Sequence, residues 1–389
     1  MSRPPVKGPL KLLHLHSTFD AGGKERRAVA LMNRWGKGQK DQPIEHHIVS
    51  AQPGAMGAKA LIDKKVSAFF PFGFPPLAGK LGVGRLRQLA RAMRGFDLVL
   101  TYNWGAMDAC MAHAVFAPTM GLPPLIHHED GFNADEADGL KTSRNWYRRV
   151  ALARASALMV PSRQLEHIAL TVWHQPRSRV QRIANGIDTG LYARKPKPDL
   201  LPRVVKRPGE KWLGTLAGLR AVKNLPRMVR AMKDLPPEWH LVILGEGPER
   251  EAITAEAIRL ELGHRVHLPG HVADPSLAVG LFDLFALSSD SEQAPLSVIE
   301  AMAAGLAVAS PAVGDVAEMV AEPNRRFIVP ANDEAAFAGA IATLAGDEPL
   351  RRAIGKANRD RARAEFDESV MANLYAQVYA QALGTNPFR

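Results

Sequence analysis

Residues 285–320 read FALSSDSEQAPLSVIEAMAAGLAVASPAVGDVAEMV, and this stretch predicts the fold. A mostly apolar run, Leu281–Leu287, predicts a buried strand that ends in a polar turn. Pro295 suits the first turn of a helix, and Gly305 suits the position just after the last turn. A second apolar run, Leu306–Ala309, predicts the next strand. This order of strand, helix and strand indicates an α/β unit with a parallel sheet.

Two carboxylates accompany this helix. Glu292 stands just before it, at the expected carboxyl edge of the sheet, where the helix N-terminus at Leu296 and Ser297 offers free N–H groups to a phosphate. Glu300 follows eight residues later, on the inward part of the helix. A carboxylate can accept two charge-assisted hydrogen bonds from the neighbouring hydroxyls of a sugar or ribose. The stretch therefore predicts one site for a phosphate and for hydroxyl groups.

At these residues the chain resembles the family 4 glycosyltransferases, which are retaining enzymes of the GT-B fold. Glu292 and Glu300 match the Glu-x7-Glu signature of that family, and the EAMAAG helix accompanies them. The resemblance implies an α/β protein with two Rossmann-like domains facing a central cleft. It also implies that Glu292 contacts the donor sugar and Glu300 the nucleotide ribose. The alternative is an ordinary α/β unit with one surface Glu and one helix Glu.

Length and composition agree with a two-domain globular protein. The chain has 389 residues, of which 46% are hydrophobic and 23% charged. Its one cysteine, Cys110, excludes an internal disulfide and suits a reducing cytoplasm, where we expect it as a buried small residue. The first ten residues lack the apolar core of a signal peptide, and no run of eighteen apolar residues occurs. We therefore expect a cytoplasmic location.

The net charge of +11 is concentrated in the first half. Residues 1–193 hold 26 Lys and Arg against 14 Asp and Glu, whereas the remainder holds 24 against 25. Such an excess favours an anionic partner, either nucleic acid or an acidic membrane leaflet. The chain carries no recognisable nucleic-acid module, which favours the membrane.

A glycine-rich loop follows the first predicted strand, Leu10–His16. Gly22 and Gly23 allow the backbone to approach a ligand closely, just before a helix that we expect from about Glu25. The loop resembles the GGxE form of the family, in which it approaches the donor diphosphate and the acceptor. A plain tight turn is the alternative.

Four titratable residues end the strand in LIHHEDGF, residues 125–132. Such a density is typical of an active cleft. Relatives usually have Glu-His-Gly here, so Asp130 occupies the position of the family's cleft histidine. Either His127 or His128 supplies an imidazole from just upstream, or Asp130 acts as a carboxylate, and the sequence leaves this open. A metal site is a further alternative, although adjacent ligands on a strand point to opposite faces.

Two basic segments of the first half could lie on anionic lipid. Arg87, Arg91 and Arg94 fall on one face of a predicted helix, 85–94. A second cluster combines basic with aromatic residues and consists of Arg144, Trp146, Tyr147, Arg148 and Arg149. Solvated charge is the alternative for both segments. Relatives with a segment like DGLKTSRNWYRR, residues 138–149, belong to bacterial exopolysaccharide or cell-surface glycan pathways, so the resemblance implies a glycan or lipid-linked acceptor.

The domain boundary is predicted near residue 193. RIANGID, residues 182–188, resembles the family's signature at the start of the interdomain connection, and residues 195–208 have the Pro, Lys and Arg content of a linker. We predict a first, acceptor-side domain at 1–193 and a nucleotide-sugar-binding domain at 194–367. A last amphipathic helix, about 368–389, packs back on the first domain.

The second half supplies further candidates for the donor site. Arg220 and Lys223 follow a predicted strand, and two cations there can neutralise a diphosphate leaving group. The resemblance is to the Arg-and-Lys loop of the family. It also implies that the turn at Gly245 and the backbone at His271 and Val272 lie beside the nucleotide. Ordinary surface cations are the alternative for Arg220 and Lys223.

Together with the resemblance, these features predict a retaining transfer of a sugar from a nucleoside diphosphate sugar to a hydroxyl. We expect a UDP-sugar, and the sequence leaves the choice between UDP and GDP open. The chain contains no Asp-Xaa-Asp triplet, so we predict no metal and no cofactor beyond the donor co-substrate. Three rivals differ in testable ways. A nucleotide-sugar 2-epimerase of the same fold needs no acceptor, a nucleic-acid binder shows steep salt dependence, and a non-catalytic GT-B binding protein turns nothing over.

Overall fold

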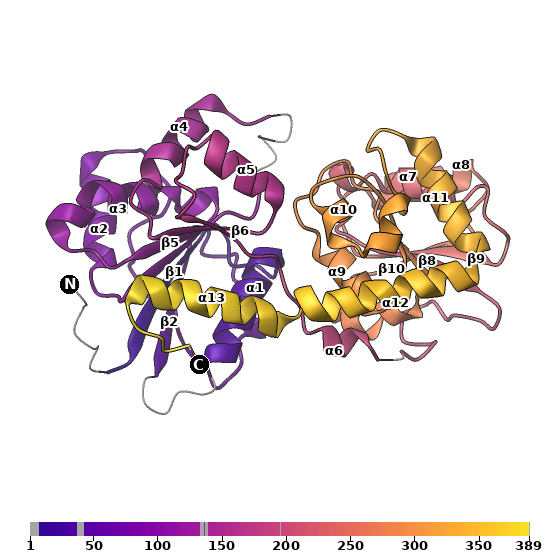
Figure 1. Cartoon of the computed structure of the whole chain (residues 1–389), viewed down its shortest axis with the longest axis horizontal. Coiled ribbons are helices and arrows are strands. Elements are labelled where there is room, and N and C mark those ends of the chain that lie inside the picture. Colours follow the sequence, from indigo (N-terminus) through magenta and orange to yellow (C-terminus); the bar gives the residue numbers. More distant parts are fainter. Residues whose placement is uncertain (1–7, 37–42, 133–135, 137–138, 195, 389) are drawn as a thin grey trace. The chain divides into compact units, whose positions relative to one another are not determined.

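The computed structural model describes residues 8–36, 43–132, 136, 139–194 and 196–388. The chain divides into two compact units, residues 1–184 with 371–389 and residues 185–370. Each unit is a parallel sheet covered by helices (Figure 1). The expectations for residues 1–7, 138 and 195 fall outside the described ranges.

The first unit contains a seven-stranded parallel sheet in the order β3-β2-β1-β4-β5-β6-β7. Its strands are β1 (Leu10–His16), β2 (Ile44–Ser50), β3 (Ser67–Phe69), β4 (Leu98–Tyr102), β5 (Leu125–His128), β6 (Ala157–Val160) and β7 (Val180–Arg182). Its helices are α1 (Gly23–Trp35), α2 (Val83–Met93), α3 (Met107–Met120), α4 (Thr142–Ala151), α5 (Arg163–Thr171) and most of α13 (Glu368–Leu383).

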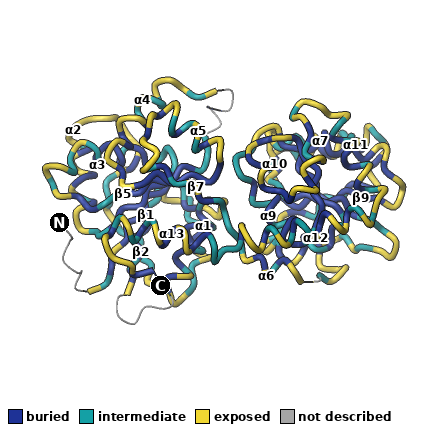
Figure 2. Tube along the Cα trace, viewed as in Figure 1, coloured by how far each residue is buried: buried dark blue, intermediate teal, exposed yellow. Residues whose placement is uncertain are grey.

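Both faces of this sheet are buried. Apolar side chains of α1 and α13 pack with one set of strand residues, which includes Leu10 and Leu12 of β1. Side chains of α2, α3, α4 and α5 pack with the alternate set, which includes Leu13 and Leu15. Covered on both faces, the central strands form the buried centre of the unit, whereas the edge strand β3 exposes Ser67 and Phe69 and most other exposed residues lie on helices and loops (Figure 2).

The second unit repeats this architecture with six strands in the order β10-β9-β8-β11-β12-β13. The strands are β8 (Lys211–Leu216), β9 (Trp239–Leu244), β10 (Val266–Gly270), β11 (Leu284–Ala286), β12 (Val308–Pro311) and β13 (Ile328–Val329). The helices are α6 (Thr189–Tyr192), α7 (Leu225–Ala231), α8 (Arg250–Arg259), α9 (Leu296–Ala303), α10 (Val316–Met319), α11 (Glu334–Gly346) and α12 (Glu348–Glu365).

The α/β architecture predicted from residues 285–320 is confirmed, with local corrections to both strands. The second strand covers Val308–Pro311 and not Leu306–Ala309. The first strand starts at Leu284, not at Leu281, because Asp283 interrupts the apolar run. The Asp283 carboxylate accepts hydrogen bonds from the Trp212 backbone N–H at 2.7 Å and from Lys206 Nζ at 2.6 Å. This carboxylate fixes the start of β11 beside β8.

The two units divide after Ala184, and the sequence predicts the boundary after residue 193. The intervening helix α6 packs against α9 of the second unit. Its preceding residue Ile187 forms a parallel bridge with Asp367, and Thr189 donates a hydrogen bond to the Asp367 carboxylate at 2.6 Å. These contacts explain why the NGID segment belongs to the second unit.

Candidate functional site

The strand order of the second unit defines where a ligand is expected. Strands β8 and β11 are neighbours, but the chain leaves β8 toward β9 on one side and reaches β12 from β11 on the other. In open parallel sheets, ligands bind beyond the carboxyl ends of the strands at such a reversal. The loop after β8 carries Arg220 and Lys223, and the loop after β11 carries Glu292. The fold therefore brings both predicted loops to one edge.

Backbone and side-chain hydrogen bonds join these two loops. Ser288 Oγ donates to the carbonyl of Lys223 at 2.8 Å, and the Asp290 N–H donates to the carbonyl of Val222 at 2.9 Å. Asn224 donates through its side-chain amide to Asp290 Oδ1 at 3.0 Å. The cationic loop is thus held in place by the turn that precedes Glu292.

Lys223 and Glu292 form an ion pair at the centre of this edge. Lys223 Nζ lies 2.5 Å from Glu292 Oε1, and the two side chains are 16% and 12% exposed. Ser289 Oγ donates to the same carboxylate oxygen at 2.7 Å. Both charged groups are therefore oriented, and both retain an exposed part that a ligand can reach.

Arg220 lies on the same loop as Lys223 but, among the described residues, does not form an ion pair. Its side chain is exposed, and within the described ranges it has no hydrogen bond or ion pair. The loop itself is a single turn of 3-10 helix, Ala221–Lys223, that ends at Asn224 in a left-handed conformation. An unengaged guanidinium beside an engaged ammonium leaves positive charge available for an anion.

Helix α9 supplies the remaining predicted groups of this edge. It begins at Leu296, directly after Pro295, and Gly305 with φ of +80° follows its end. Leu296 and Ser297 form its first turn and are partly exposed, so their N–H groups lie where the sequence predicts a phosphate. Glu300 accepts a hydrogen bond from the Tyr192 hydroxyl at 2.8 Å on Oε1.

A glycine after β12 also shapes this site. Gly314, after β12, has φ of +52°, and a Cβ there would lie 2.3 Å from the carbonyl oxygen of Gln293. The next residue, Asp315, donates its backbone N–H to that same oxygen at 2.8 Å. Only a residue without a side chain permits this close approach beside Glu292.

The other nucleotide candidates lie on neighbouring strands. Gly245 is buried after β9 and donates its N–H to the carbonyl of Gly270 at 2.9 Å, which joins the ends of β9 and β10. His271 is exposed and Val272 is partly exposed just after β10. Because β9 and β10 lie on the other side of β8 from β11, these residues follow strands on the opposite side of the cationic loop from Glu292.

In the first unit, the glycine-rich loop opens helix α1. Gly22 precedes the helix, Gly23 begins it, and both are exposed. Glu25 is 2% exposed and turns back toward the loop, where it accepts hydrogen bonds from Thr18 Oγ1 at 3.2 Å and from Lys24. The helix starts two residues before the expected Glu25, and the loop is held by its own helix.

Asp130 follows β5 and is tied to α1. Its carboxylate is bound by both terminal nitrogens of Arg27, with Nη2 to Oδ2 at 2.8 Å, and its N–H donates to Asn103 Oδ1 at 2.8 Å. Burial opposes the charge of Arg27, but Asp130 beside it raises the guanidinium pKa above its ordinary value. Asp130 is therefore an ion-pair partner in this structure, with a side chain 13% exposed.

His127 and His128 lie inside the first unit, fully buried. His127 Nδ1 bonds Thr101 Oγ1 at 2.9 Å, and its Nε2 is 3.6 Å from Glu129. His128 Nε2 bonds the Tyr379 hydroxyl of α13 at 2.8 Å. Burial lowers the pKa of His127, but Cys110 and Glu129 raise it to about 9, whereas burial keeps the pKa of His128 well below 6.5. Of the three open candidates, only Asp130 keeps an exposed part.

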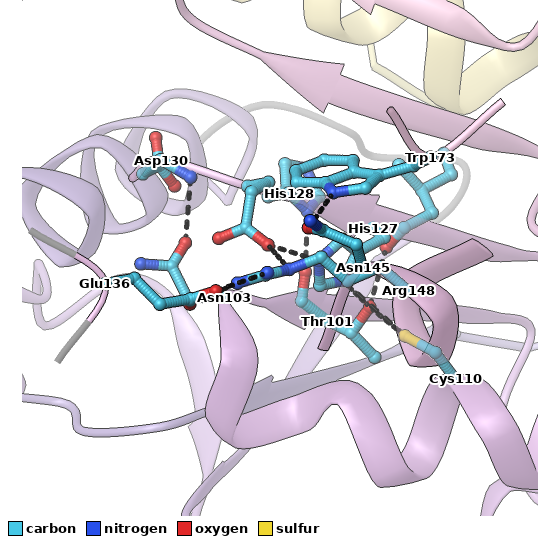
Figure 3. A network of polar contacts seen from close by, with 12 residues as sticks. Thr101, Asn103, Cys110, His127, His128, Asp130, Glu136, Asn145, Arg148 and Trp173 are labelled. Atoms are coloured by element: carbon cyan, nitrogen blue, oxygen red, sulfur yellow. Dashed lines mark hydrogen bonds and ion pairs between the residues drawn. The ribbon is translucent and has the colours of Figure 1, made fainter. Parts of the chain in front are cut away.

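Arg148 forms the centre of a buried network that sequence reasoning did not find (Figure 3). It is fully buried, pairs with Glu136 at 3.0 Å and with Glu129 at 3.4 Å, and lies over the rings of Trp104, Phe132 and Trp173. This placement corrects the expectation of a basic surface cluster on α4, because Arg148 faces inward. Cys110 is buried in the same network, as predicted.

The predicted residues therefore fall into two groups. Lys223, Glu292 and Glu300 share the edge of the second unit with Arg220 and the start of α9, and the glycine loop and Asp130 are joined by Arg27 in the first unit. Sequence reasoning missed Arg27 and Tyr192, because their partners lie 103 and 108 positions away in the sequence. It also gave no role to Ser289, although its partner Glu292 is only three residues away. Within the described ranges, no three His, Cys, Asp or Glu side chains gather as a metal site requires.

Comparison with known proteins gives a consistent result. The family model "Glycosyltransferase Family 4" matches residues 21–191, and "Glycosyl transferases group 1" matches residues 197–361. The D-inositol 3-phosphate glycosyltransferase of Xylanimonas cellulosilytica is 27% identical over 99% of this chain and 100% of its own length. The N-acetyl-alpha-D-glucosaminyl L-malate synthase of Bacillus anthracis is 25% identical over 54% of this chain and 55% of its own length.

A solved structure agrees in fold. The crystal structure of Anabaena Alr3699/HepE in complex with UDP superposes with a TM-score of 0.75 at 19% identity, and covers 96% of this chain and 100% of that one. None of the helices in the described ranges is both long and apolar enough for a membrane crossing.

Proposed function

The chain belongs to the family 4 glycosyltransferases of the GT-B fold, and from this premise we propose that it transfers a hexose, with retention, from a UDP-sugar to a hydroxyl of a lipid-linked or cell-surface glycan acceptor. One observation carries the proposal. Lys223 and Glu292, from loops 69 residues apart, meet at 2.5 Å beside the start of α9. A cation, a carboxylate and a helix N-terminus at one sheet edge suit the phosphate and hydroxyls of a sugar nucleotide.

Each group then has a role toward the donor. Lys223, Arg220 and the N–H groups at Leu296 and Ser297 bind the diphosphate, and Glu292 accepts hydrogen bonds from the sugar. Glu300 binds the ribose. The backbone near Gly245, His271 and Val272 borders the base. The UDP complex of Alr3699/HepE supports uracil as the base, because that protein shares the fold of this chain.

The transfer step needs charge neutralisation above all. The bond between the anomeric carbon and the phosphate oxygen breaks, and a bond to the acceptor oxygen forms on the same face of the sugar. The acceptor's proton passes to the departing phosphate oxygen, so UDP leaves with it. Negative charge grows on that phosphate, and preorganised cations at Arg220 and Lys223 stabilise it more in the transition state than in the ground state. This division of roles requires no divalent metal.

Acceptor recognition is assigned to the first unit, whose excess of positive charge and exposed apolar side chains suit an anionic lipid surface. Helix α2 packs against α3, and α3 packs against α4. Their outer side exposes apolar Val83 at 74%, Trp146 at 58% and Val150 at 50%, and also basic residues, which are Arg87, Arg91, Arg94 and Arg149. Arg149 lies over the Trp146 ring. Exposed Trp beside Arg is typical of membrane interfaces, so we expect peripheral docking at the cytoplasmic leaflet.

The test of the reaction has two stages. A thermal-shift panel of UDP-glucose, UDP-galactose, UDP-N-acetylglucosamine, UDP-glucuronate and GDP-mannose should give one selective stabilisation, which Glu300→Ala removes. With that donor, anomeric coupling constants in the NMR spectrum of the product should report retention. Incubation without acceptor should yield no epimerised sugar nucleotide. No stabilisation by any of the five donors, or an epimerised product, contradicts the proposal.

The membrane contact has its own test. Co-sedimentation with vesicles that contain phosphatidylglycerol should exceed that with phosphatidylcholine alone, and Trp146→Ala with Arg149→Glu should reduce it. The pair Lys356→Ala with Arg352→Glu on α12 is the matched control, because both side chains are about 80% exposed, at 81% and 79%. Equal binding to both vesicle types contradicts docking.

A further inference from the structure

Tyr192 holds Glu300, the predicted ribose ligand, in one orientation. Its hydroxyl donates to Glu300 Oε1 at 2.8 Å, and its side chain belongs to the four-residue helix α6, which packs against α9. Tyr192 is 7% exposed, so its ring is fixed by packing. The motifs quoted from the sequence do not include this residue, which lies 108 positions from Glu300.

The position of the hydroxyl is itself well determined. Asp188 caps α6 by accepting hydrogen bonds from the N–H groups of Gly190 at 3.0 Å and Leu191 at 3.3 Å. Thr189 bonds Asp367 at 2.6 Å, and Asp367 also binds Ser369. Helix α6 is therefore anchored at its start and packed along its length, so that the Tyr192 hydroxyl is directed at the carboxylate from a rigid support.

A carboxylate on a partly exposed helix face needs such a support to bind a diol. The last torsion of a glutamate side chain is broad, and its two oxygens exchange freely unless a neighbour fixes the carboxylate plane. A hydroxyl that donates to Oε1 from a fixed direction sets the plane of the carboxylate. The Tyr192 phenol thus determines the orientation in which Glu300 meets the ribose hydroxyls.

We infer that Tyr192 is a positioning residue for nucleotide recognition, which orients Glu300 toward the ribose hydroxyls of the donor. This inference rests on the proposed function, since it requires a nucleotide at this edge. It goes beyond that function by assigning the selection of ribose over deoxyribose to a residue that contacts no substrate. Its effect therefore appears in the comparison between ribose and deoxyribose ligands.

The test uses the full chain and titration calorimetry with UDP, 2′-deoxy-UDP and 3′-deoxy-UDP. The wild type should bind UDP about tenfold more tightly than at least one deoxy analogue, because a lost hydrogen bond to a charged group costs about 1.5 kcal/mol. Tyr192→Phe should weaken UDP binding and bring the preference to within about twofold, while affinity for the deoxy analogue stays nearly unchanged. In a Glu300→Ala background, Tyr192→Phe should have no further effect.

Tyr147→Phe is the matched control. The Tyr147 hydroxyl also donates to a carboxylate, Asp108 Oδ1 at 2.6 Å, but in the first unit. This variant loses the same kind of hydrogen bond and should keep the ribose preference. A Tyr192→Phe protein that keeps the full preference overturns the inference and leaves the proposed function intact. A wild type that binds UDP without any preference also overturns it, and a wild type that binds neither UDP nor GDP overturns both.

Discussion

Replacing Lys223 by methionine should lower kcat far more than it raises the KM for the sugar nucleotide. The ammonium of Lys223 lies 2.5 Å from Glu292. A donor diphosphate has to share this cation with the carboxylate, so part of the binding energy is offset by the weakened pair. The leaving phosphate carries more negative charge in the transition state than in the bound donor, so it competes better with Glu292 for the ammonium. The mutation therefore acts mainly on the chemical step.

The magnitude follows from distance and exposure. A unit cation about 4 Å from a unit anion is worth about 4 kcal/mol at an effective dielectric constant near 20. The Lys223 and Glu292 side chains are 16% and 12% exposed, so solvent screens the interaction in part. Competition with Glu292 reduces it further, which leaves about 2–3 kcal/mol for the transition state and predicts a loss of about 30- to 150-fold in kcat.

The assay is the initial rate of UDP release at saturating and at low donor concentration, with UDP affinity measured separately by calorimetry. Lys206→Met provides the matched control, because Lys206 Nζ lies 2.6 Å from Asp283 and those side chains are 20% and 21% exposed. Both variants lose one partly buried ion pair of the second unit, and only the first touches the proposed site. A kcat for Lys223→Met within threefold of the wild type, or an equal loss in Lys206→Met, refutes the reasoning.

Three further predictions test other parts of the structure. Burial lowers the pKa of His14, His16, His46 and His128, to about 3 for His46, so all four are neutral when folded and take up protons on unfolding. The free energy of unfolding is therefore highest above pH 6.5 as far as these histidines determine it, and it falls by about 5–6 kcal/mol at pH 5.5. A urea midpoint of the first unit that is the same at pH 7 and at pH 5.5 contradicts this. Asp130→Asn deprives the buried Arg27 of its anion and should destabilise the first unit by about 3–5 kcal/mol, which Arg27→Met with Asp130→Leu should largely restore. If Asp130→Asn instead keeps its stability and loses turnover, Asp130 is catalytic. Excess EDTA should change the initial rate by less than about twofold, and activity restored only by added Mg²⁺ or Mn²⁺ would contradict a metal-free site.

Local sequence signals predicted the elements that carry the site. Pro295 and Gly305 bracket α9, and the polar residues after β11 form the turn before Glu292. The shared edge of the two loops follows from the parallel topology alone, since carboxyl ends of parallel strands meet at one side of the sheet. The ion pair between Lys223 and Glu292 does not follow, because it depends on how two loops of irregular backbone are held together.

The histidines of β5 show where a sequence argument loses its force. Alternation along a strand correctly sends His127 and His128 to opposite faces, and a titratable residue at a strand end suggests an active cleft. Both faces of this sheet are covered by helices, however, so a side chain on either face is buried. His127 bonds Thr101 and His128 bonds Tyr379 of α13, a partner 251 residues away. Without the packing of α13, no pattern in residues 125–132 distinguishes an interior histidine from an exposed one.

The net charge counted from the sequence holds in the structure, whereas the predicted position of the basic residues on α4 does not. The sequence predicted a basic face from five neighbouring residues of α4, yet Arg148 is buried and Arg144 pairs with Glu136 at 3.0 Å. Each one-to-one pair removes one charge of each sign, so pairing cannot reduce the excess of 26 basic over 14 acidic residues in 1–193. The excess positive charge is therefore carried by basic residues outside these pairs. Four of the exposed ones are Arg87, Arg91, Arg94 and Arg149. The inward turn of Arg148 therefore reduces the basic surface of α4 and leaves the net positive charge of residues 1–193 unchanged.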